Sequence, residues 1–312
     1  MTVIKDLRDR EIDADRFEAD DEADALLAGA VDLHQHPGPS PFPRRMGIAD
    51  AARDAAGAGF RAIVVKSHHQ SMVTDILALQ PEVLSEIPIE VYGGIALNHT
   101  VGGLNPFAVE LALRMGGRVV WFPTLASPAH IEHHRHTTTN FPTSQVQLRD
   151  NPPIHIADDD GRLRPEAREV LDVIAAEDAV LTCGHLGVHD TDLLIAGARE
   201  AGISRIVVNH PVFVVGASPE QAVEWARKGV YIEHCLSMYF GLPERRRDIE
   251  ELLRFVDAVG PEQTIFSSDS GQKVNPLPVT LFRRAVRALL DRGVPAEQLT
   301  RLVASNADAL LR

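Results

Sequence analysis

The sequence predicts one (β/α)8 barrel, the TIM-barrel architecture of the α/β class, over residues 29–312. Eight short runs are almost continuously apolar, as expected for strands that are covered on both faces. Helical patterns separate them, and strict alternation of strand and helix produces a parallel sheet with right-handed crossovers. Eight such units are the number that closes a barrel. No G-x-G-x-x-G motif follows the first run, which disfavours a doubly wound open sheet.

The expected strands and the signals between them follow one another along the chain. The runs cover residues 30–34, 61–66, 90–97, 118–122, 179–184, 203–209, 230–233 and 264–268. Asn105-Pro106 and Ser218-Pro219 each place a capping side chain before a proline that suits the first helical turn. Glycines at 57, 59, 116, 117 and 229 stand where a helix has to end before the next strand.

Two segments lie outside this alternation. Residues 1–28 are acidic and rich in alanine, and we expect them to form an N-terminal helical extension that packs on the barrel. The ends of the fourth and fifth expected strands, Phe122 and Gly184, are 62 residues apart, so an insertion covers about residues 126–163. An insertion at this end of a strand lies over the barrel mouth. Its histidine-rich run, 130–136, is interpreted equally well as a lid or as a solvated loop.

The composition argues against several classes of partner. The chain carries 44 acidic and 31 basic residues, a net charge of −13, so no basic surplus exists for a nucleic acid or an anionic membrane. No apolar run approaches the roughly 20 residues of a membrane span, and the N-terminus lacks the apolar segment of a secretory signal. Only two cysteines occur, Cys183 and Cys235, which excludes a disulfide scaffold. We therefore expect a cytoplasmic protein that acts on a small molecule, and a homo-oligomer is compatible with the sequence.

Histidines gather where the expected strands end. All 14 lie between His34 and His234. His34 and His36 alternate along the first strand, so both imidazoles point to one spot in the barrel mouth. The other polar strand ends are residues 66–69, 98–99, 184–185, 209–210, 233–234 and 268–270. Catalytic residues of such barrels come from these ends, and imidazole plus carboxylate is the donor set of a divalent cation such as Zn²⁺.

The same residues resemble the amidohydrolase superfamily of metal-dependent hydrolases. The resemblance rests on the segment 32–37, Asp-Leu-His-Gln-His-Pro, followed in order by His185, His210 and Asp269. The tail 304–311 is similar to the Asn-Pro-Ala-x-x-Leu ending of that superfamily, with Ala307 where proline is common. The resemblance covers residues 29–312 and says little about the substrate.

The resemblance implies a role for each of these side chains. His34 and His36 would hold a divalent cation, Zn²⁺ or alternatively Mn²⁺, with help from Asp269. His185 and His210 would hold a second ion or, with one ion only, orient the substrate. Asp269 would also be the catalytic general base that takes a proton from water activated by the cation.

One position departs from the superfamily pattern. Two-metal members commonly carry a carboxylated lysine on the fourth strand, whereas here that strand ends in Trp121-Phe122. Lys66 is the only lysine at an expected strand end, and it gives two functional hypotheses. Either it is carbamylated and bridges two metal ions, or it binds an anionic group of the substrate as a cation. The structural alternative is a side chain that reaches out to solvent.

Several further polar side chains stand at the rim. Those expected to contact the substrate or support the ligands are His68, His69 and His99. Glu233 is expected to pair with an arginine, with metal ligation or acid catalysis as alternatives. A nucleophilic pair of Cys183 with His185 is disfavoured, because neighbours on one strand seldom reach the geometry that activates a thiol.

Together these features predict a metal-dependent hydrolase that splits a C–N or C–O bond at a carbonyl, for example in a cyclic amide or a lactone. The alternative within the superfamily is a decarboxylase or hydratase of a small carboxylic acid. Many decarboxylating members carry Glu two positions before the first histidine, where this chain has Asp32, and this disfavours that alternative. The alternative outside the superfamily is a barrel that binds a metal or ligand without turnover.

Overall fold

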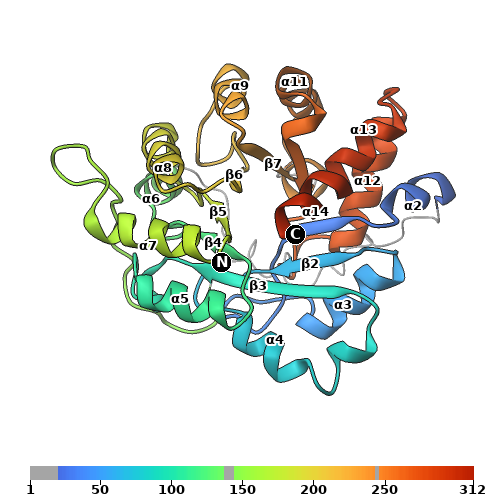
Figure 1. The fold of residues 1–312 in the computed structure, drawn as a ribbon. Helices are drawn as coiled ribbons and strands as arrows, with labels where there is room; N and C mark the ends of the chain where they lie inside the picture. Colours follow the sequence, from blue (N-terminus) through green and yellow to red (C-terminus); the bar gives the residue numbers. More distant parts are fainter. Residues whose placement is uncertain (1–19, 137–143, 243–245) are drawn as a thin grey trace, which may run out of the picture.

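The fold is an eight-stranded parallel barrel surrounded by helices (Figure 1). The structure is a computed structural model, and it describes residues 20–136, 144–242 and 246–312. The strands pair in sequential order, β1 to β8, and each neighbouring pair is parallel. The predicted (β/α)8 barrel is therefore confirmed.

The eight strands lie where the apolar runs predicted them. They are β1 (Val31–Gln35), β2 (Ala62–Val65), β3 (Glu90–Ala96), β4 (Val119–Trp121), β5 (Val180–Thr182), β6 (Ile206–Asn209), β7 (Tyr231–Cys235) and β8 (Thr264–Ser267). Three boundaries differ from the prediction by two or more residues, and the first is that β5 ends at Thr182 rather than at residue 184. Strand β6 begins at Ile206 rather than at residue 203, and β7 continues to Cys235 instead of ending at Glu233. Glu233 consequently lies within a strand and not at its end.

Helices follow the strands and begin where the sequence signals them. They are α2 (Asp21–Leu27), α3 (Ile48–Gly57), α4 (Val73–Leu79), α5 (Pro106–Arg114), α6 (Pro128–His136), α7 (Pro165–Ala176), α8 (Val188–Glu200), α9 (Pro219–Arg227), α10 (Ser237–Phe240), α11 (Ile249–Val259), α12 (Pro278–Leu290), α13 (Ala296–Thr300) and α14 (Asn306–Leu311). Asn105 caps α5 by accepting a hydrogen bond from the Ala108 N–H, and Ser218 caps α9 in the same way. Among the described residues, no helix is both long and apolar enough to cross a membrane.

The barrel closes between β8 and β1 through residues that follow the end of β8. The Asp269 N–H donates to the His34 carbonyl at 2.8 Å, and the His36 N–H donates to the Ser270 carbonyl at 2.7 Å. Deeper in the seam, the Asp32 carboxylate accepts a hydrogen bond from the Ser268 N–H at 2.9 Å. The seam therefore fixes the two β1 histidines beside Asp269.

The opposite end of the barrel is closed by the C-terminal tail. Helix α14 places Ala307 and Leu310 in one buried apolar cluster with side chains of the strands, including Trp121 of β4. Asn306 donates hydrogen bonds to the carbonyls of Pro261 and Thr264, both at 2.7 Å, where β8 begins. The tail that resembles the superfamily ending thus anchors the start of β8, the strand that leads to Asp269.

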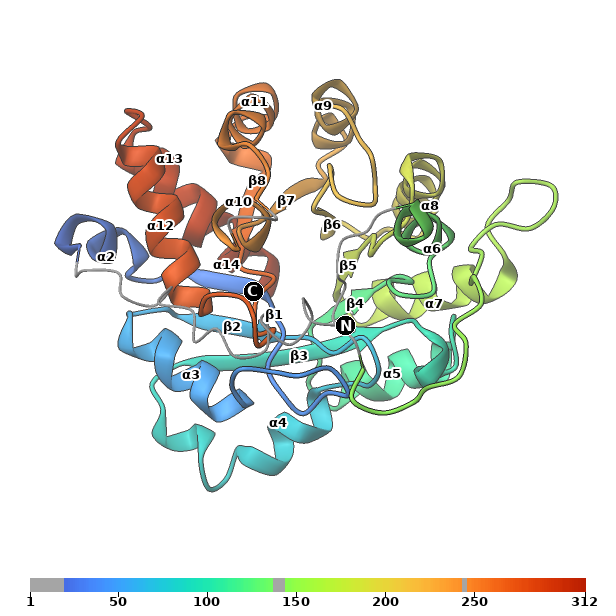
Figure 2. The same cartoon turned by 180° about the vertical axis from the view of Figure 1, so that it is seen from behind.

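Part of the expected N-terminal extension is helical. Helix α2 buries Ala23 and Leu27 and lies beside α12 and α13 (Figure 2). Asp24 forms an ion pair with Arg283 of α12. Residues 1–19 of the expected extension lie outside the described residues.

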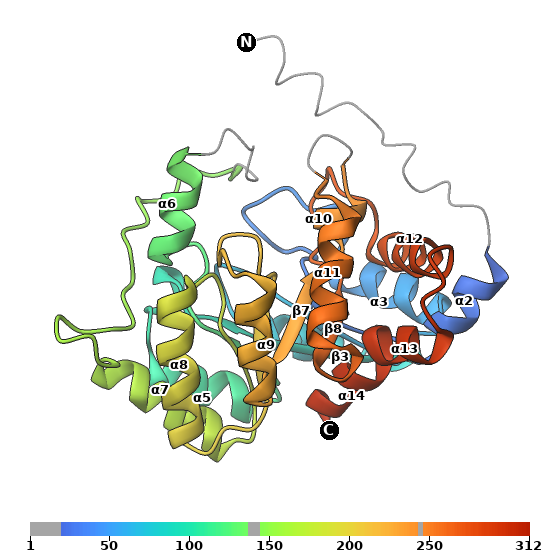
Figure 3. The ribbon, with the colours of Figure 1, turned by 90° about the horizontal axis from the view of Figure 1, so that it is seen from above.

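The insertion after β4 begins with α6. This helix lies at the same end of the barrel as α10, the helix that follows β7 (Figure 3). The seven-residue stretch 137–143 of the insertion lies outside the described residues. Helix α6 therefore lies at the carboxyl ends of the strands, which favours the interpretation of the insertion as a lid.

We predict that Gly184 is required for the approach of β5 to β4. Its φ is +62°, and a Cβ there would lie 2.2 Å from the Phe122 carbonyl oxygen. Gly184→Ala should lower the free energy of unfolding by at least about 2 kcal/mol, because backbone strain and overlap add. Urea denaturation followed by circular dichroism measures this. Gly57→Ala, at a position with open space and ordinary φ, is the matched control, and equal stability of both variants would contradict the prediction.

Candidate metal centre

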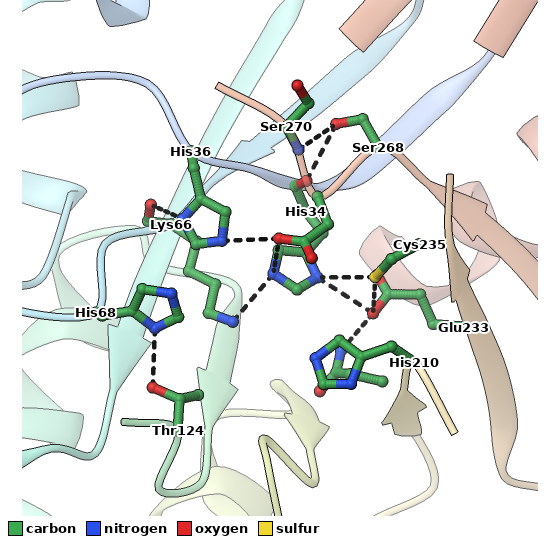
Figure 4. A network of polar contacts seen from close by, with 12 residues as sticks. His34, His36, Lys66, His68, Thr124, His210, Glu233, Cys235, Ser268 and Ser270 are labelled. Carbon is green, nitrogen blue, oxygen red and sulfur yellow. Dashed lines mark hydrogen bonds and ion pairs between the residues drawn. The ribbon is translucent and has the colours of Figure 1, made fainter. Parts of the chain in front are cut away.

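His34 and His36 lie close together at the barrel mouth (Figure 4). With Asp269 they form a group of three side chains whose possible ligand atoms lie within 4.8 Å of one another. His36 Nε2 lies 3.1 Å from Asp269 Oδ1, and His34 Nε2 lies 3.5 Å from the same oxygen. Both imidazoles are buried, whereas the Asp269 side chain is 18% exposed and so can be reached from solvent. The structure thus brings together the three residues that the sequence analysis assigned to the first metal ion.

The other ring nitrogen of each histidine is held from behind. His36 Nδ1 donates to the Lys66 carbonyl at 3.0 Å, and His34 Nδ1 donates to Glu233 Oε2 at 3.3 Å. Carbonyl and carboxylate oxygens only accept hydrogen bonds, so these contacts assign the proton to Nδ1 and leave Nε2 as an electron-pair donor. Metal-ligating histidines are oriented by partners of this kind.

The facing atoms fit a cation. With the proton of His36 on Nδ1, its Nε2 and the Asp269 oxygen are two acceptors only 3.1 Å apart. Two acceptors repel each other unless a proton or a metal ion lies between them. Burial lowers the pKa of His36 to about 3, so the imidazole carries no second proton at neutral pH. The donor set therefore favours a divalent cation of the Zn²⁺ or Mn²⁺ type.

Lys66 lies inside the site and does not reach solvent. It is 1% exposed, so the structural alternative given above is wrong. Its Nζ lies 3.0 Å from His34 Nε2 and 5.2 Å from the centre of the Trp121 ring. Burial lowers the pKa of Lys66 to about 8.

A second group of imidazoles lies beside the first. The rings of His185 and His210 are 4.8 Å apart between centroids, and His34 is 6.3 Å from His210. His210 Nδ1 donates to the Phe213 carbonyl at 3.2 Å, which leaves Nε2 available. Burial lowers the pKa of His210 to about 4 and that of His185 well below its ordinary value, so both rings are neutral.

His130 joins this second group from the insertion. Its Nδ1 lies 2.8 Å from His185 Nδ1, and the two rings are stacked with centroids 4.8 Å apart. The sequence predicts the run 130–136 as either a lid or a solvated loop and gives His130 no ligand role, because spacing along an insertion does not tell which strand end it will reach. The contact places α6 over the mouth.

The three histidines expected near the substrate have different positions. His68 is buried, stacks on His36 with centroids 4.8 Å apart and contacts Thr124 Oγ1 at 2.9 Å. His69 is half-buried and packs edge-on against Phe42. His99 is exposed, and its Nε2 contacts the Pro152 carbonyl at 2.8 Å, so it is not brought to the mouth.

Glu233 supports a ligand and does not pair with an arginine. It contacts His34 and accepts a hydrogen bond from Asn209 Nδ2, and the described residues show no arginine within ion-pair distance of it. Cys235, two residues further along β7, places its Sγ 3.7 Å from His34 Nδ1. Cys183 lies in an apolar cluster, away from this site.

A pocket opens beside these groups. Its lining residues are Phe42, Arg44, His68, His185, His210, Phe213, Asp269 and Gln272. Two of them, His210 and Asp269, have φ values of +30° and +48°, in the left-handed region that side chains other than glycine rarely adopt. Backbone strain of this kind is found preferentially at functional sites.

Comparisons with known proteins agree with the fold. A model described as a family of unknown function, DUF6282, matches residues 29–233. No curated protein matches the chain. Three similar solved structures are an amidohydrolase from Pseudomonas aeruginosa (13% identity, TM-score 0.59, 93% of this chain and 98% of that one), the probable dipeptidase PvdM from the same organism (11%, 0.59, 92% and 96%), and a variant of a PTE-like lactonase from Deinococcus radiodurans (14%, 0.57, 93% and 97%). At these identities the comparison shows that the chain shares the fold of these three proteins.

We predict that His234 makes the fold sensitive to acid. It lies on the outer side of β7, buried among Tyr239, Phe255 and Phe266, and burial lowers its pKa to about 4. In the unfolded chain the pKa is about 6.5, so between these values only the unfolded state binds the proton. The stabilising contribution of neutral His234 is therefore complete above pH 6.5 and is lost as the pH falls towards 4.

The measurement is urea denaturation of metal-free protein from pH 7 to pH 4. The unfolding free energy of the wild type falls as the pH is lowered. In His234→Leu this fall should be smaller by up to about 1.4 kcal/mol per pH unit in this window. His189→Leu, which changes an exposed histidine on α8, is the control. Equal slopes for the wild type and His234→Leu would show that the prediction is wrong.

Proposed function

We propose a function for this chain, which belongs to DUF6282, a family of unknown function: it is a metal-dependent hydrolase that splits a C–N or C–O bond at a carbonyl group of a small molecule such as a cyclic amide or a lactone. One observation carries the proposal. The Nε2 electron pair of His36 faces the Asp269 carboxylate at 3.1 Å, and His34 Nε2 is close to the same oxygen. A cation satisfies this arrangement, and the barrel mouth is where such folds perform catalysis.

The residues around the cation would divide the work. A bound divalent cation polarises a carbonyl group and lowers the pKa of water to about 7. Asp269 Oδ1 would accept the proton from the attacking water, because it is the carboxylate that both imidazoles face and it is partly open to solvent. Burial alone would raise the pKa of Asp269, but a cation held between this carboxylate and the imidazoles would outweigh burial and keep the carboxylate ionised at neutral pH. It can therefore act as a base.

His185 and His210 would hold a second ion or orient the substrate. Both are neutral and buried, and they line the pocket next to Asp269. His130 Nδ1 lies against His185 Nδ1, so it fixes the ring of His185 in either role. His68, which stacks on His36, lines the same pocket and would contact the substrate.

Lys66 would be carbamylated when two ions are bound. As an ammonium group it lies 3.0 Å from His34 Nε2, the position that the first ion needs, and two cations at that spacing repel each other. The ammonium group first loses a proton, and reaction of the neutral amine with carbon dioxide then forms an N–C bond and releases a second proton, which leaves an anionic carbamate with oxygen ligands. In the alternative, Lys66 stays cationic, one ion binds, and the ammonium group contacts an anionic group of the substrate.

Names of the similar structures favour hydrolysis over the other reactions. They include an amidohydrolase, a lactonase and a D-hydantoinase, names that refer to amide, lactone and hydantoin chemistry. Decarboxylation or hydration of a small carboxylic acid is the alternative reaction on the same barrel. A barrel that binds its ligand without turnover is the alternative to catalysis.

We predict that the purified protein contains Zn²⁺ or Mn²⁺ and hydrolyses members of a panel of lactones and cyclic amides. Asp269→Asn should lower the turnover rate about 10²- to 10⁴-fold, because the amide cannot accept the proton. Most of the metal should remain, since His34 and His36 are unchanged, and inductively coupled plasma mass spectrometry measures it. Asp160→Asn, at an exposed loop position, is the control.

Three outcomes would contradict the hydrolase. Release of carbon dioxide from small aromatic acids with one equivalent of metal would favour the decarboxylase. Tight ligand binding by a wild type that shows no turnover, so that Asp269→Asn has no rate to lower, would favour the barrel that binds without catalysis. A protein that takes up no metal in solution would remove all metal-dependent reactions.

We predict two equivalents of metal in the wild type and one in Lys66→Ala, because the carbamate would be the bridging ligand. Loading of the second equivalent should depend on added bicarbonate. Lys228→Ala, which changes an exposed lysine at the end of α9, should retain both equivalents. Two equivalents in Lys66→Ala would exclude the bridge and leave Lys66 as a substrate-binding cation.

A further inference from the structure

The side chain of Arg44, which ends in a charged guanidinium, lines the pocket. It lies in the loop between β1 and α3, and this loop is fixed to the segment after β8. Arg44 forms an antiparallel bridge with Gln272, and the Arg45 N–H donates to the Gly271 carbonyl at 2.9 Å. The Arg44 guanidinium lies over the ring of Phe42, 5.7 Å from its centre. Backbone pairing and ring contact together hold the side chain at the mouth.

This guanidinium has no carboxylate partner in the described part of the chain. Its Nε is buried and has no hydrogen-bond acceptor there. Asp269 is the one carboxylate among the residues that line the pocket, and it forms no ion pair with Arg44 within 4.0 Å. By contrast, the neighbouring Arg45 donates to the Asn275 carbonyl at 3.0 Å. Arg44 is half-buried, and the charge of Asp269 acts on it only from beyond ion-pair distance. A guanidinium partly removed from water with no anion in contact is costly, so its neighbourhood favours an anionic ligand.

The charges of the mouth point the same way. With a divalent cation bound, Arg44 and Lys66 add to its positive charge, whereas Asp269 and Glu233 are the nearby anions. Asp32 lies deeper, two residues before the first histidine of β1, and its charge does not reverse the balance. A carbamylated Lys66 would be negative but would bring a second cation with it. Burial lowers the pKa of Arg44 to about 10, which leaves it charged at neutral pH.

We propose that Arg44 binds a carboxylate group of the substrate, so that the proposed hydrolase acts on small organic acids that carry an amide, ester or lactone carbonyl. The inference rests on the proposed function only in placing the reacting carbonyl beside Asp269. The planar guanidinium binds a carboxylate through two parallel hydrogen bonds, which also fixes the orientation of the bound molecule. Phe42 and Phe213 line the pocket and suit a flat apolar part between carboxylate and carbonyl.

The test measures binding rather than turnover. Full-length protein is titrated by calorimetry with benzoate and with benzamide, its neutral counterpart of the same shape, once loaded with metal and once after metal removal. The wild type should bind benzoate more tightly than benzamide in both forms. Arg44→Met should weaken benzoate at least about tenfold and leave benzamide unchanged, because only the carboxylate loses a charged partner. Arg44→Lys should lie between the two, since it keeps the charge without the planar fork.

Controls separate this inference from the proposed function. Arg45→Met removes an adjacent arginine that does not line the pocket and should not change either affinity. Arg44→Gln replaces Arg44→Met if thermal unfolding shows that the methionine variant is not folded. A benzoate affinity within about twofold of the wild type in the Arg44 variant, or no benzoate binding by the wild type, overturns the inference. If the wild type takes up no metal or shows no turnover but still binds benzoate in a way that depends on Arg44, the hydrolase proposal is wrong and the carboxylate site remains.

Discussion

The seam between β8 and β1 is the constraint on which the rest of the site depends. Its backbone hydrogen bonds join Asp269 to His34 and Ser270 to His36. Three of these residues, His34, His36 and Asp269, carry the candidate ligand atoms, and Asp269 takes a strained φ of +48°. Barrel closure and assembly of the donor set are therefore one event. It follows that a bound cation would stabilise the seam, because the unfolded chain has no such set.

Burial prepares the donors chemically as well as geometrically. Removing imidazoles from water favours their neutral form, which is the form that binds a metal. For Glu233, burial alone would raise the pKa, but His34 and the hydrogen bond from Asn209 outweigh it and lower the pKa to about 2. Neutral rings and ionised carboxylates thus coexist at neutral pH. Each ligand is also held from behind, so little ordering remains to be done when the cation binds.

The fold was predictable from the sequence, because apolar runs fix the strands and polar residues mark their ends, and so were the side chains on inward-facing strand positions. The direction that the chain takes after a strand ends was not predictable. His99 follows β3 through a short 3₁₀ turn that carries it outward to Pro152, although its place at a strand end equals that of His185. Glu233 was misplaced because β7 continues to Cys235, which puts Glu233 one layer inside, against His34. His130 depended on the path of an insertion, which no local pattern encodes.

Strands and loops of this barrel carry different information. The strand ends supply the imidazoles and the carboxylate of the candidate metal centre, and the similar solved structures, at 11–14% identity, share the barrel fold that places these ends together. The pocket walls come from loops: Phe42 and Arg44 follow β1, Phe213 follows β6, and Gln272 follows β8. Loop residues face only the ligand, so their chemistry can change without disturbing the barrel. Likeness of fold therefore does not tell which molecule binds, whereas the role proposed for Arg44 would limit the ligands to molecules that carry a carboxylate group.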